Sequence, residues 1–554
     1  MQGFTWSGVT FLILCISCCF LLHPAEARFR VSSTAHMRLY RTNDLNLVPQ
    51  KIRITDHDKC TPEAVNNSTL RNPPPMRLQK PRLCDSQVRQ YSGYIDMEDK
   101  HVFFWYFGSR ARLSPTFNAA TDNVPLVFWF SGGPGCSSQI ANWQENGPCM
   151  YVPKNATFDP SMSDERRKAL PHEVQRNPWA WNNVADIVFV DQPVGTGFSY
   201  GPMPSSTEGA TDTAWRTMQA VYAKLTEDAR TNGEVSIKDV YLFGESYAGR
   251  YIPVFTEYLI HMNKHVSASA DLQERGYVSL PLRGIGIGNG MFDHRLQASS
   301  AHTMACQSNY PPMFSRQQCA HLRSTVVPQC TAQMNKCYGE FTPTTSSLGM
   351  RMDKCVRLEP EKWRSSKECA AAKTICNGAL NWTNMVNAYD VRPQARMVPD
   401  DYVEYLRTRE FTNAIGVTQS GVGFEECSDE VFDRFGSTSD EMSRSALSSL
   451  QYILNQHMPV LLYSGDADFI CNWHGNLAVA RALNWHGKGA FKSAISAPWN
   501  WPTKSGNKVG AGEVLSAENL TFLRVFEAGH EVPYYQPQAS LYMLAQFITS
   551  QKVR

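Results

Sequence analysis

A serine set among small residues is the strongest candidate for a nucleophile in this chain. The apolar run Val240–Phe243 leads directly into Gly244-Glu245-Ser246-Tyr247-Ala248-Gly249. Such a run indicates a buried strand, and small neighbours allow a sharp turn into a helix that leaves the Ser246 hydroxyl exposed. Ala248 replaces the second glycine of the usual Gly-x-Ser-x-Gly pattern. The segment predicts nucleophilic chemistry at Ser246, and a glycine turn of purely structural use is the alternative.

A nucleophilic serine needs a histidine as its base and an acid that orients this histidine. Two further apolar runs end in such residues. Val460–Tyr463 is followed by Asp466 and Asp468, and Leu520–Phe526 is followed by His530. Sites of this kind form at the carboxyl ends of parallel strands. We therefore expect His530 to accept the serine proton and pass it to the leaving amine, with one of the two aspartates as its partner.

The glycine-rich loop Ser131-Gly132-Gly133-Pro134-Gly135 follows the apolar run Val124–Phe130. It lacks the Gly-Lys-Ser/Thr ending of a phosphate-binding loop. A loop after an early strand supplies an oxyanion-hole N–H in enzymes with a serine turn of this type, so we expect the N–H groups of Gly133 and Tyr247 to form that hole. The glycines at 284, 286, 288 and 290 do not fit the dinucleotide pattern. We expect neither a cofactor nor a metal.

Apolar runs alternate with helical patterns along much of the chain. Tyr91–Asp96 and His101–Phe107 flank a short polar turn, which is typical of a β-hairpin. Trp215, Met218, Tyr222 and Leu225 share one face of a helix, and Pro537 can open a final helix. Buried strands are expected at Val124–Phe130, Ile187–Val190, Val240–Phe243, Gly284–Ile287, Val460–Tyr463 and Leu520–Phe526. The alternation predicts a doubly wound, mostly parallel α/β sheet of the α/β-hydrolase fold.

Residues 291–450 interrupt this alternation and are rich in cysteine. Strand-like segments resume only after residue 458, so we expect a cap insertion that divides the α/β-hydrolase core into residues 84–290 and 451–554, rather than a separate domain. Residues 28–83 hold 11 Lys+Arg against four Asp+Glu. This segment is expected to be a basic extension or propeptide, with a disordered tail as the alternative. Eight cysteines lie in the insertion: Cys306, Cys319, Cys330, Cys337, Cys355, Cys369, Cys376 and Cys427.

Residues 1–27 have the features of a secretory signal peptide. An apolar stretch, Phe11–Leu22, precedes the small-x-small triplet at 25–27 and is too short to span a bilayer. Removing three cysteines with it leaves 16 − 3 = 13, which predicts six disulfides and one free thiol. Five sequons fit a secreted glycoprotein, at Asn66, Asn67, Asn155, Asn381 and Asn519. A vacuole, a lysosome or the extracellular space are all open as destinations.

The chain has 554 residues, of which 42% are hydrophobic and 19% charged, with a net charge of +2. That composition supports a large core and excludes global disorder. The near balance of charge gives no reason to expect nucleic acid as a partner, and no apolar run reaches the ~20 residues of a membrane span. Whether the protein is a monomer or a homodimer stays open.

Five motifs together resemble the serine carboxypeptidases, peptidase family S10, of the carboxypeptidase Y type. The resemblance covers about residue 84 to the C-terminus and implies an enzyme that releases single residues from the C-terminus of peptides and proteins at acidic pH through an acyl-enzyme. The motifs are WFSGGPGCSS at 129–138, NPWAWN at 177–182 with DQPVGTGFSY at 191–200, GESYAG at 244–249, GDADFICNW at 465–473 and AGHEVP at 528–533.

The resemblance also implies roles for individual residues. It selects Asp468 as the acid of a triad with Ser246 and His530, and it keeps Gly133 and Tyr247 as the oxyanion hole. It leaves Cys471 as the free thiol beside the substrate pocket. It pairs Cys136 with a cysteine of the cap, expected to be Cys427.

The residues that would bind a substrate's α-carboxylate follow from the same resemblance. The family uses an asparagine, a glycine N–H and two glutamates that share a proton, and the matching positions here are Ser131, Gly132, Glu145 and Glu245. Two close carboxyls cannot both ionise cheaply, so binding is expected to weaken as the pH rises. Serine in place of asparagine predicts weaker anchoring of the carboxylate.

The resemblance also implies that Glu531 lines the pocket of the departing residue, at a position where many carboxypeptidase Y-like members carry methionine. An acid there predicts tolerance of C-terminal Lys or Arg. Two other functions remain open from the residues. One is acyl transfer to a small molecule by the same triad. The other is a non-catalytic binding protein, against which the intact triad argues.

Overall fold

The computed structural model describes residues 72–154, 164–340, 366–378, 387–393, 395, 397–502 and 508–554. Among these residues no helix combines the length and the apolar character that crossing a membrane requires. The expected signal peptide and the sequons at Asn66, Asn67, Asn155 and Asn381 lie outside the described residues.

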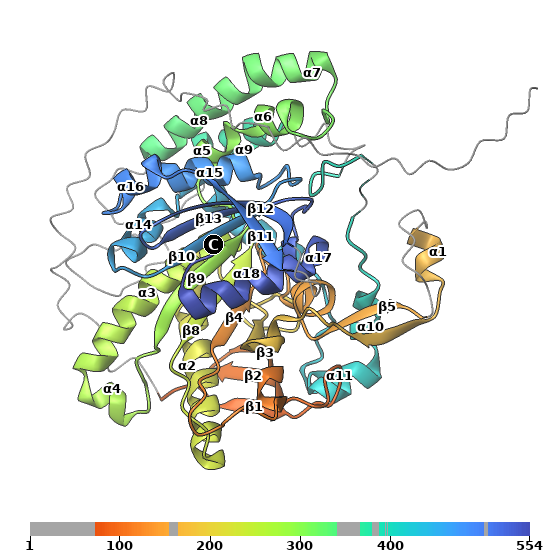
Figure 1. The fold of residues 1–554 in the computed structure, drawn as a ribbon, viewed down its shortest axis with the longest axis vertical. Helices are drawn as coiled ribbons and strands as arrows, with labels where there is room; N and C mark the ends of the chain where they lie inside the picture. Colours follow the sequence, from red (N-terminus) through yellow and green to blue (C-terminus); the bar gives the residue numbers. More distant parts are fainter. Residues whose placement is uncertain are drawn as a thin grey trace, which may run out of the picture. The chain divides into compact units, whose positions relative to one another are not determined.

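Eleven strands form one twisted sheet in the order β1-β2-β3-β7-β4-β8-β9-β10-β13-β12-β11 (Figure 1). The six strands from β7 to β13 in this order run parallel to one another. The pairings of β7 with β3, of β13 with β12 and of the strands beyond them are antiparallel. Their bounds are β1 Met76–Gln79, β2 Gln90–Met97, β3 Lys100–Phe107, β4 Leu126–Phe130, β7 Asp186–Val190, β8 Val240–Glu245, β9 Leu282–Gly288, β10 Val460–Gly465, β11 Ala497–Pro502, β12 Lys508–Ala517 and β13 Leu520–Val525. The expected α/β-hydrolase fold with a mostly parallel sheet is confirmed.

Helices cover both faces of the sheet, as the continuous apolar runs predict. In β4, Phe128 faces a core formed with α2 (Thr207–Asn232), α3 (Ala248–Ala268) and α14 (Leu447–Asn455). Its neighbour Trp129 faces a second core formed with α18 (Pro537–Ser550). Successive side chains of a strand point to opposite faces, so a strand packed on both sides is apolar throughout.

Glycine in β9 makes room for aromatic rings of the neighbouring strands. A Cβ at Gly286 would lie 2.0 Å from the ring of Phe243 on β8, and one at Gly288 would lie 2.6 Å from the ring of Tyr463 on β10. Both distances are far below van der Waals contact. The glycine series in this strand is therefore explained by packing.

Three features were not expected from the sequence. The strands β11 and β12 extend the sheet as an antiparallel hairpin. A separate two-stranded sheet pairs β5 (Cys149–Pro153) with β6 (His172–Arg176). The strand β1 pairs with β2 and lies within residues 28–83, so the sheet begins before the boundary expected at residue 84.

All the regular elements described between β9 and β10 are helical. Figure 1 shows α5–α9 gathered beside α15 (Trp473–Ala482), whereas α10 lies beside β5. The α-helices of this insertion are α5 His294–Ala298, α6 Ala301–Gln307, α7 Arg316–His321, α8 Val327–Glu340, α9 Lys367–Cys376, α10 Tyr402–Arg407, α11 Arg409–Ile415, α12 Asp429–Ser437, α13 Asp440–Ser443 and α14.

Disulfides fix this insertion internally and to the core. Three lie within it: Cys306–Cys319, Cys330–Cys376 and Cys337–Cys369. Cys136–Cys427 joins it to the loop after β4, and Cys84–Cys149 joins two parts of the core. The remaining described cysteine, Cys471, is free and buried. Cys60 and Cys355 lie outside the described residues, so the expectation of six disulfides stays a prediction.

Candidate active site

The strand ends bring Ser246, Asp468 and His530 to one edge of the sheet. Ser246 directly follows β8, and Asp468 and His530 follow β10 and β13 within a few residues. The strands β8, β9, β10 and β13 are parallel neighbours, so their carboxyl ends meet there. The three residues predicted to act together therefore come from adjacent strand ends.

Ser246 lies on a strained turn between β8 and α3. Its φ is 60°, in the left-handed region that a residue with a side chain rarely adopts. The turn is held because Ser246 N–H donates to Gly288 O at 3.0 Å and Met291 N–H donates to Ser246 O at 2.8 Å. A Cβ at Gly132 would lie only 2.6 Å from the Ser246 Cβ, so the loop after β4 needs glycine to pass the nucleophile.

His530 and Asp468 form a buried hydrogen-bonded pair. His530 Nδ1 lies 2.8 Å from Asp468 Oδ2, and both side chains are buried. The same oxygen accepts from Asn289 Nδ2 at 2.8 Å and from Cys471 N–H at 3.2 Å. Asp468 Oδ1 accepts from Ile470 N–H at 3.0 Å. The carboxylate is therefore fixed by several donors, and it in turn fixes the imidazole.

Asp466, the other candidate acid, is engaged elsewhere. Its Oδ1 accepts from Tyr310 Oη at 2.6 Å and from Glu527 N–H at 3.0 Å. Its Oδ2 accepts from Arg524 Nη2 at 3.0 Å. Of the two aspartates that the sequence left open, Asp468 is the one that contacts His530.

The electrostatics of His530 follow from its buried position among carboxylates. Burial acts to lower the pKa of the imidazole, but the charge and hydrogen bond of Asp468 outweigh this and raise the pKa to about 9. The charges of Glu531 and Glu245 add to the increase.

The expected oxyanion donors sit on two separate segments that meet at Ser246. Gly133 has a φ of 107°, which favours glycine, and its loop is held by the hydrogen bond from Cys136 N–H to Gly132 O at 3.1 Å. Tyr247 directly precedes α3, and its side chain is fully buried. Cys136 is disulfide-bonded to Cys427, the pair that the family resemblance implies.

Glu245, which directly precedes Ser246, is buried, and so is Glu145, whose charge acts on Glu245. Glu145 ends the π-helical turn η5 (Ala141–Glu145), and Glu245 ends β8. Burial, with the charge of Glu531, raises the pKa of Glu145 to about 8. Burial and then the charge of Glu145 raise the pKa of Glu245 well above its ordinary value. The two carboxyls therefore retain at least one proton well above the pH at which a glutamate ordinarily ionises.

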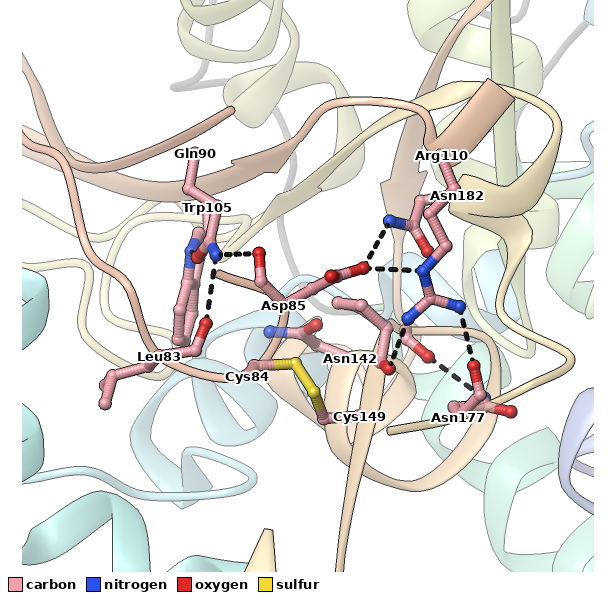
Figure 2. Close-up of a disulfide and its surroundings, with 12 residues drawn as sticks. Leu83, Cys84, Asp85, Gln90, Trp105, Arg110, Asn142, Cys149, Asn177 and Asn182 are labelled. Carbon is pink, nitrogen blue, oxygen red and sulfur yellow. Dashed lines mark hydrogen bonds and ion pairs between the residues drawn. A yellow bond between two sulfur atoms is a disulfide. The ribbon is translucent and has the colours of Figure 1, made fainter. Parts of the chain in front are cut away.

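Hydrogen bonds hold the backbone around Glu145, and Figure 2 shows Asp85, Arg110 and Asn177 of this network beside the Cys84–Cys149 disulfide. Asn177 Nδ2 donates to Glu145 O at 3.1 Å and to Gly147 O at 2.9 Å. Arg110, which is buried, donates to Asn177 O at 2.7 Å and to Asp85 Oδ2 at 2.5 Å. The neighbouring Cys84–Cys149 disulfide ties the end of this segment to the core. Glu145 is thus carried on a rigid, hydrogen-bonded support.

Ser131 and Gly132 lie in the loop that follows β4, and this loop passes close to Ser246 at Gly132. Ser131 is buried, and its Oγ accepts from Trp129 Nε1 at 3.1 Å. Its own N–H donates to Ser138 Oγ at 3.1 Å. The hydroxyl proton of Ser131 remains available as a single donor.

Glu531 and Cys471, expected in the pocket of the departing residue, both adjoin the His530 pair. Cys471 is buried, and its Sγ lies within 4.8 Å of a carboxylate oxygen of Asp468 and of a ring nitrogen of His530. Burial raises the pKa of Glu531, and its Oε2 has no hydrogen-bond partner among the described residues. Tyr389 packs edge-on against His530 with ring centroids 5.1 Å apart, and its carbonyl accepts from His530 N–H at 2.9 Å.

Asn289 and Tyr389 were not anticipated as site residues. Asn289 follows β9 directly, and a polar residue at a strand's carboxyl end is a signal that could have identified it. Tyr389 lies in the insertion among residues without a helical or strand pattern, and we find no sequence signal for it.

The structure gives Asn519 a role other than carrying a glycan. Its Nδ2 donates to Leu454 O at 3.0 Å and to Met458 O at 2.7 Å. Both protons of the amide are therefore used to hold the connection between α14 and β10. A glycan would replace one of these protons and cost one of the two hydrogen bonds, and modification of Asn519 stays a prediction.

Comparisons with known proteins agree with this geometry. The family profile described as serine carboxypeptidase matches residues 80–550. Carboxypeptidase S1 of Penicillium janthinellum is 31% identical over 85% of this chain and 98% of its own. Carboxypeptidase Y of Schizosaccharomyces pombe is 33% identical over 83% of this chain and 41% of its own. The crystal structure of the prohormone-processing carboxypeptidase KEX1(delta)p of Saccharomyces cerevisiae superposes with a TM-score of 0.61 at 22% identity, covering 84% of this chain and 92% of that one.

Proposed function

Because this chain belongs to the serine carboxypeptidase family, we propose that Ser246, His530 and Asp468 are the catalytic triad of this hydrolase. The enzyme is a serine-type carboxypeptidase, and the triad would release single residues from peptide C-termini through an acyl-enzyme. The observation that carries the assignment is the buried hydrogen bond of 2.8 Å between His530 Nδ1 and Asp468 Oδ2 at the strand edge that also presents Ser246.

The proposed reaction begins with attack of Ser246 Oγ on the last peptide carbonyl. His530 Nε2 takes the serine proton, and Asp468 stabilises the imidazolium that forms. The N–H groups of Gly133 and Tyr247 receive the negative charge of the tetrahedral oxygen. The imidazolium then protonates the departing amine, and water repeats the sequence on the acyl-enzyme.

A carboxypeptidase must also recognise the free α-carboxylate of its substrate. We assign this to the Ser131 hydroxyl, the Gly132 N–H and the proton shared by Glu145 and Glu245. A protonated carboxyl donates a hydrogen bond to a carboxylate, whereas an ionised one repels it. The pKa of about 8 for Glu145 supports a shared proton at neutral and acidic pH.

We propose that acid favours catalysis through substrate binding. Glu145 is protonated below about pH 8 and ionised above it, and the pKa of Glu245 is also raised well above its ordinary value by burial and by the charge of Glu145. The imidazole of His530 sets the lowest pH at which the enzyme is active, because it must be neutral to act as a base. Since the charge of Glu245 helps to raise the pKa of His530, protonating this carboxyl in acid lowers that pKa and extends activity to lower pH.

We assign Glu531 and Cys471 to the pocket that holds the departing residue. Glu531 is half-buried, and its carboxyl oxygen Oε2 has no hydrogen-bond partner among the described residues, so a cationic side chain would supply one. This supports the release of C-terminal Lys and Arg.

The rest of the chain fits a protein of the secretory pathway. Five disulfides among the described residues indicate an oxidising compartment. We propose residues 1–27 as a signal peptide and 28–83 as an extension or propeptide. Residues 291–450 are proposed as a cap between the core segments 84–290 and 451–554. The destination would be a vacuole, a lysosome or the extracellular space.

The triad is tested by labelling the purified protein with an organophosphonate. We expect one label on Ser246 and release of a single C-terminal residue from a blocked peptide at about pH 5, where carboxyls of raised pKa are protonated. Ser246→Ala should lose both. Labelling without hydrolysis, together with transfer of an acyl group to an added alcohol, would favour the acyl-transferase alternative.

A further inference from the structure

Asp440 belongs to the helical insertion, but its carboxylate lies within the core. It is the first residue of α13 and is fully buried. Its Oδ2 accepts from Tyr247 Oη at 2.6 Å and from Thr207 Oγ1 at 2.7 Å, and its Oδ1 accepts from Thr207 N–H at 3.2 Å. One carboxylate thus joins the insertion to the first residue of α2 and to the residue that precedes α3.

Tyr247 is the residue whose backbone N–H we assign to the oxyanion hole. Its ring packs edge-on against Tyr251 on α3, with centroids 5.2 Å apart, and against Phe435 on α12, with centroids 6.1 Å apart. The hydrogen bond to Asp440 holds the far end of the same ring. The side chain is therefore fixed along its length, and the peptide N–H of this residue is fixed with it.

The same part of the insertion holds the other half of the oxyanion hole. Besides the disulfide of Cys427 with Cys136, Ser137 N–H donates to Glu426 O at 2.8 Å and Ser428 N–H donates to Gly135 O at 2.9 Å. Residues 426–440 therefore contact both segments that carry the assigned donors. Such donors act only when they are in place before the charge develops.

We propose that Asp440 is a positioning residue of the oxyanion hole, which it acts on through the side chain of Tyr247. The inference rests on the proposed function, because it takes the N–H groups of Gly133 and Tyr247 as the donors. Asp440 has no contact with the substrate in this proposal. Its carboxylate aims the N–H of Tyr247 at the acyl oxygen, and losing that aim costs rate rather than substrate affinity.

Two variants of the full-length protein test the connection. Tyr247→Phe keeps the ring and removes the hydroxyl. Asp440→Asn replaces one oxygen by a donor and removes the charge that faces Arg444 Nη1, which lies 3.4 Å from Asp440 Oδ1. Because the three hydrogen bonds from Tyr247 and Thr207 all need an acceptor, at least one of them is lost. For each variant we expect kcat to fall about tenfold while KM stays within about twofold. This loss is smaller than the ~100- to 1000-fold loss of kcat that follows when an oxyanion-hole donor is deleted. The double variant should match the single ones, since the two residues act through one hydrogen bond.

A matched control separates positioning from general stability. Thr207→Val removes another hydrogen bond to the same carboxylate, but it leaves Tyr247 untouched. We expect a lower Tm with kcat unchanged. A peptide aldehyde, whose tetrahedral adduct with Ser246 places an oxygen in the hole, provides a second readout. Its inhibition should weaken about tenfold in Tyr247→Phe, in step with kcat, whereas a product peptide should bind as it does to the unmodified enzyme.

The inference is overturned if Tyr247→Phe retains the kcat of the unmodified enzyme, or if Thr207→Val lowers kcat as much as Tyr247→Phe does. Effects of Tyr247→Phe and Asp440→Asn that multiply in the double variant would also overturn it. If Asp440→Asn does not fold, Tyr247→Phe and the aldehyde decide alone. Ser246→Ala distinguishes failure of the proposed triad from failure of the proposed role of Asp440. If it keeps activity, the proposed triad fails, and if it loses activity while Tyr247→Phe is unaffected, only the role of Asp440 fails.

Discussion

The indole Nε1 of Trp129 donates a hydrogen bond of 3.1 Å to Oγ of Ser131 at the carboxyl end of β4. This bond holds a buried hydroxyl in the loop that we assign to the substrate carboxylate. It also means that the oxygen already serves as an acceptor, so one proton remains to be donated to a substrate. The anchoring of the carboxylate at this position is limited to a single hydrogen bond.

Ser131→Asn is therefore expected to strengthen binding of peptide acids. An amide can accept from Trp129 with its oxygen and donate to the substrate with its nitrogen. We expect KM for a blocked dipeptide to fall about fivefold, which corresponds to roughly 1 kcal/mol for one improved hydrogen bond. The matching peptide amide lacks the carboxylate and serves as the control. An unchanged KM for the acid would remove Ser131 from the carboxylate site.

The two aspartates after β10 are expected to differ sharply in their effect on catalysis. Asp468→Asn removes the charge that orients and stabilises His530, so kcat should fall by about 10³- to 10⁴-fold. Asp466→Asn is the matched control, because its partners are Tyr310 and Arg524. It should lower Tm while kcat stays within a few fold. The reverse order of effects would mean that the triad has been assigned to the wrong acid.

Binding of peptide acids should weaken as the pH rises. The pKa of Glu145 is raised to about 8 by burial and by the charge of Glu531, so the proton that we propose it shares with Glu245 is held by Glu145 below that pH and is lost from it above that pH. We expect KM for a peptide acid to increase between pH 6 and 9, with little change for the matching peptide amide. Glu145→Gln cannot ionise and should flatten the increase. Parallel curves for acid and amide would contradict the shared proton.

The same pKa has a consequence for stability. A carboxyl whose pKa is raised on folding binds more protons in the folded state between its unfolded pKa, about 4.3, and its folded value. The contribution of Glu145 to the free energy of unfolding is therefore fully present below its unfolded pKa. That contribution is lost as the pH rises toward 8, the pKa of Glu145 in the folded protein. We therefore expect the Tm of the unmodified protein to decrease, relative to the Tm of Glu145→Gln, as the pH rises from 4 to 8. Equal Tm differences across this range would contradict a buried, protonated Glu145.

The parts of the fold that sequence patterns could predict are those with local signals. The strand β4 is apolar at every position and was expected from that alone. The hairpin of β11 and β12 was missed, since β11 combines tryptophans with prolines at both ends of its buried centre, a composition that favours loops. Its pairing is set by the sheet edge that β13 offers, which no local pattern records.

The active site divides in the same way. Ser246, Asp468 and His530 each follow a recognisable strand, so their chemistry and chain order were accessible. Asn289 contacts Asp468 across 179 residues of chain, and Asp440 contacts Tyr247 across 193. Such pairings depend on how the insertion and the strands pack together, and single-residue patterns contain no information about them.

Glu531 is expected to set the preference for the departing residue. This side chain is half-buried beside His530 and has a carboxyl oxygen without a hydrogen-bond partner in the described part of the chain. A C-terminal Lys or Arg would supply both charge and hydrogen bonds. Glu531→Gln should lower kcat/KM for peptides ending in Lys or Arg about tenfold relative to those ending in Leu or Phe. A strictly apolar preference that the substitution leaves unaltered would exclude this role.

Glu531 should also influence the base. Its charge contributes to the raised pKa of His530, after the dominant opposing effects of burial and of Asp468. Without this charge the imidazolium of His530 is less stable, so the pKa of His530 is lower. In Glu531→Gln the acidic limb of the kcat profile, measured on a peptide ending in Leu, should therefore move to lower pH. Glu513→Gln, which removes a charge that lies near Arg524, is the control and should leave the limb in place. A limb that moves to higher pH, or that moves equally in both variants, would show that Glu531 does not act on His530.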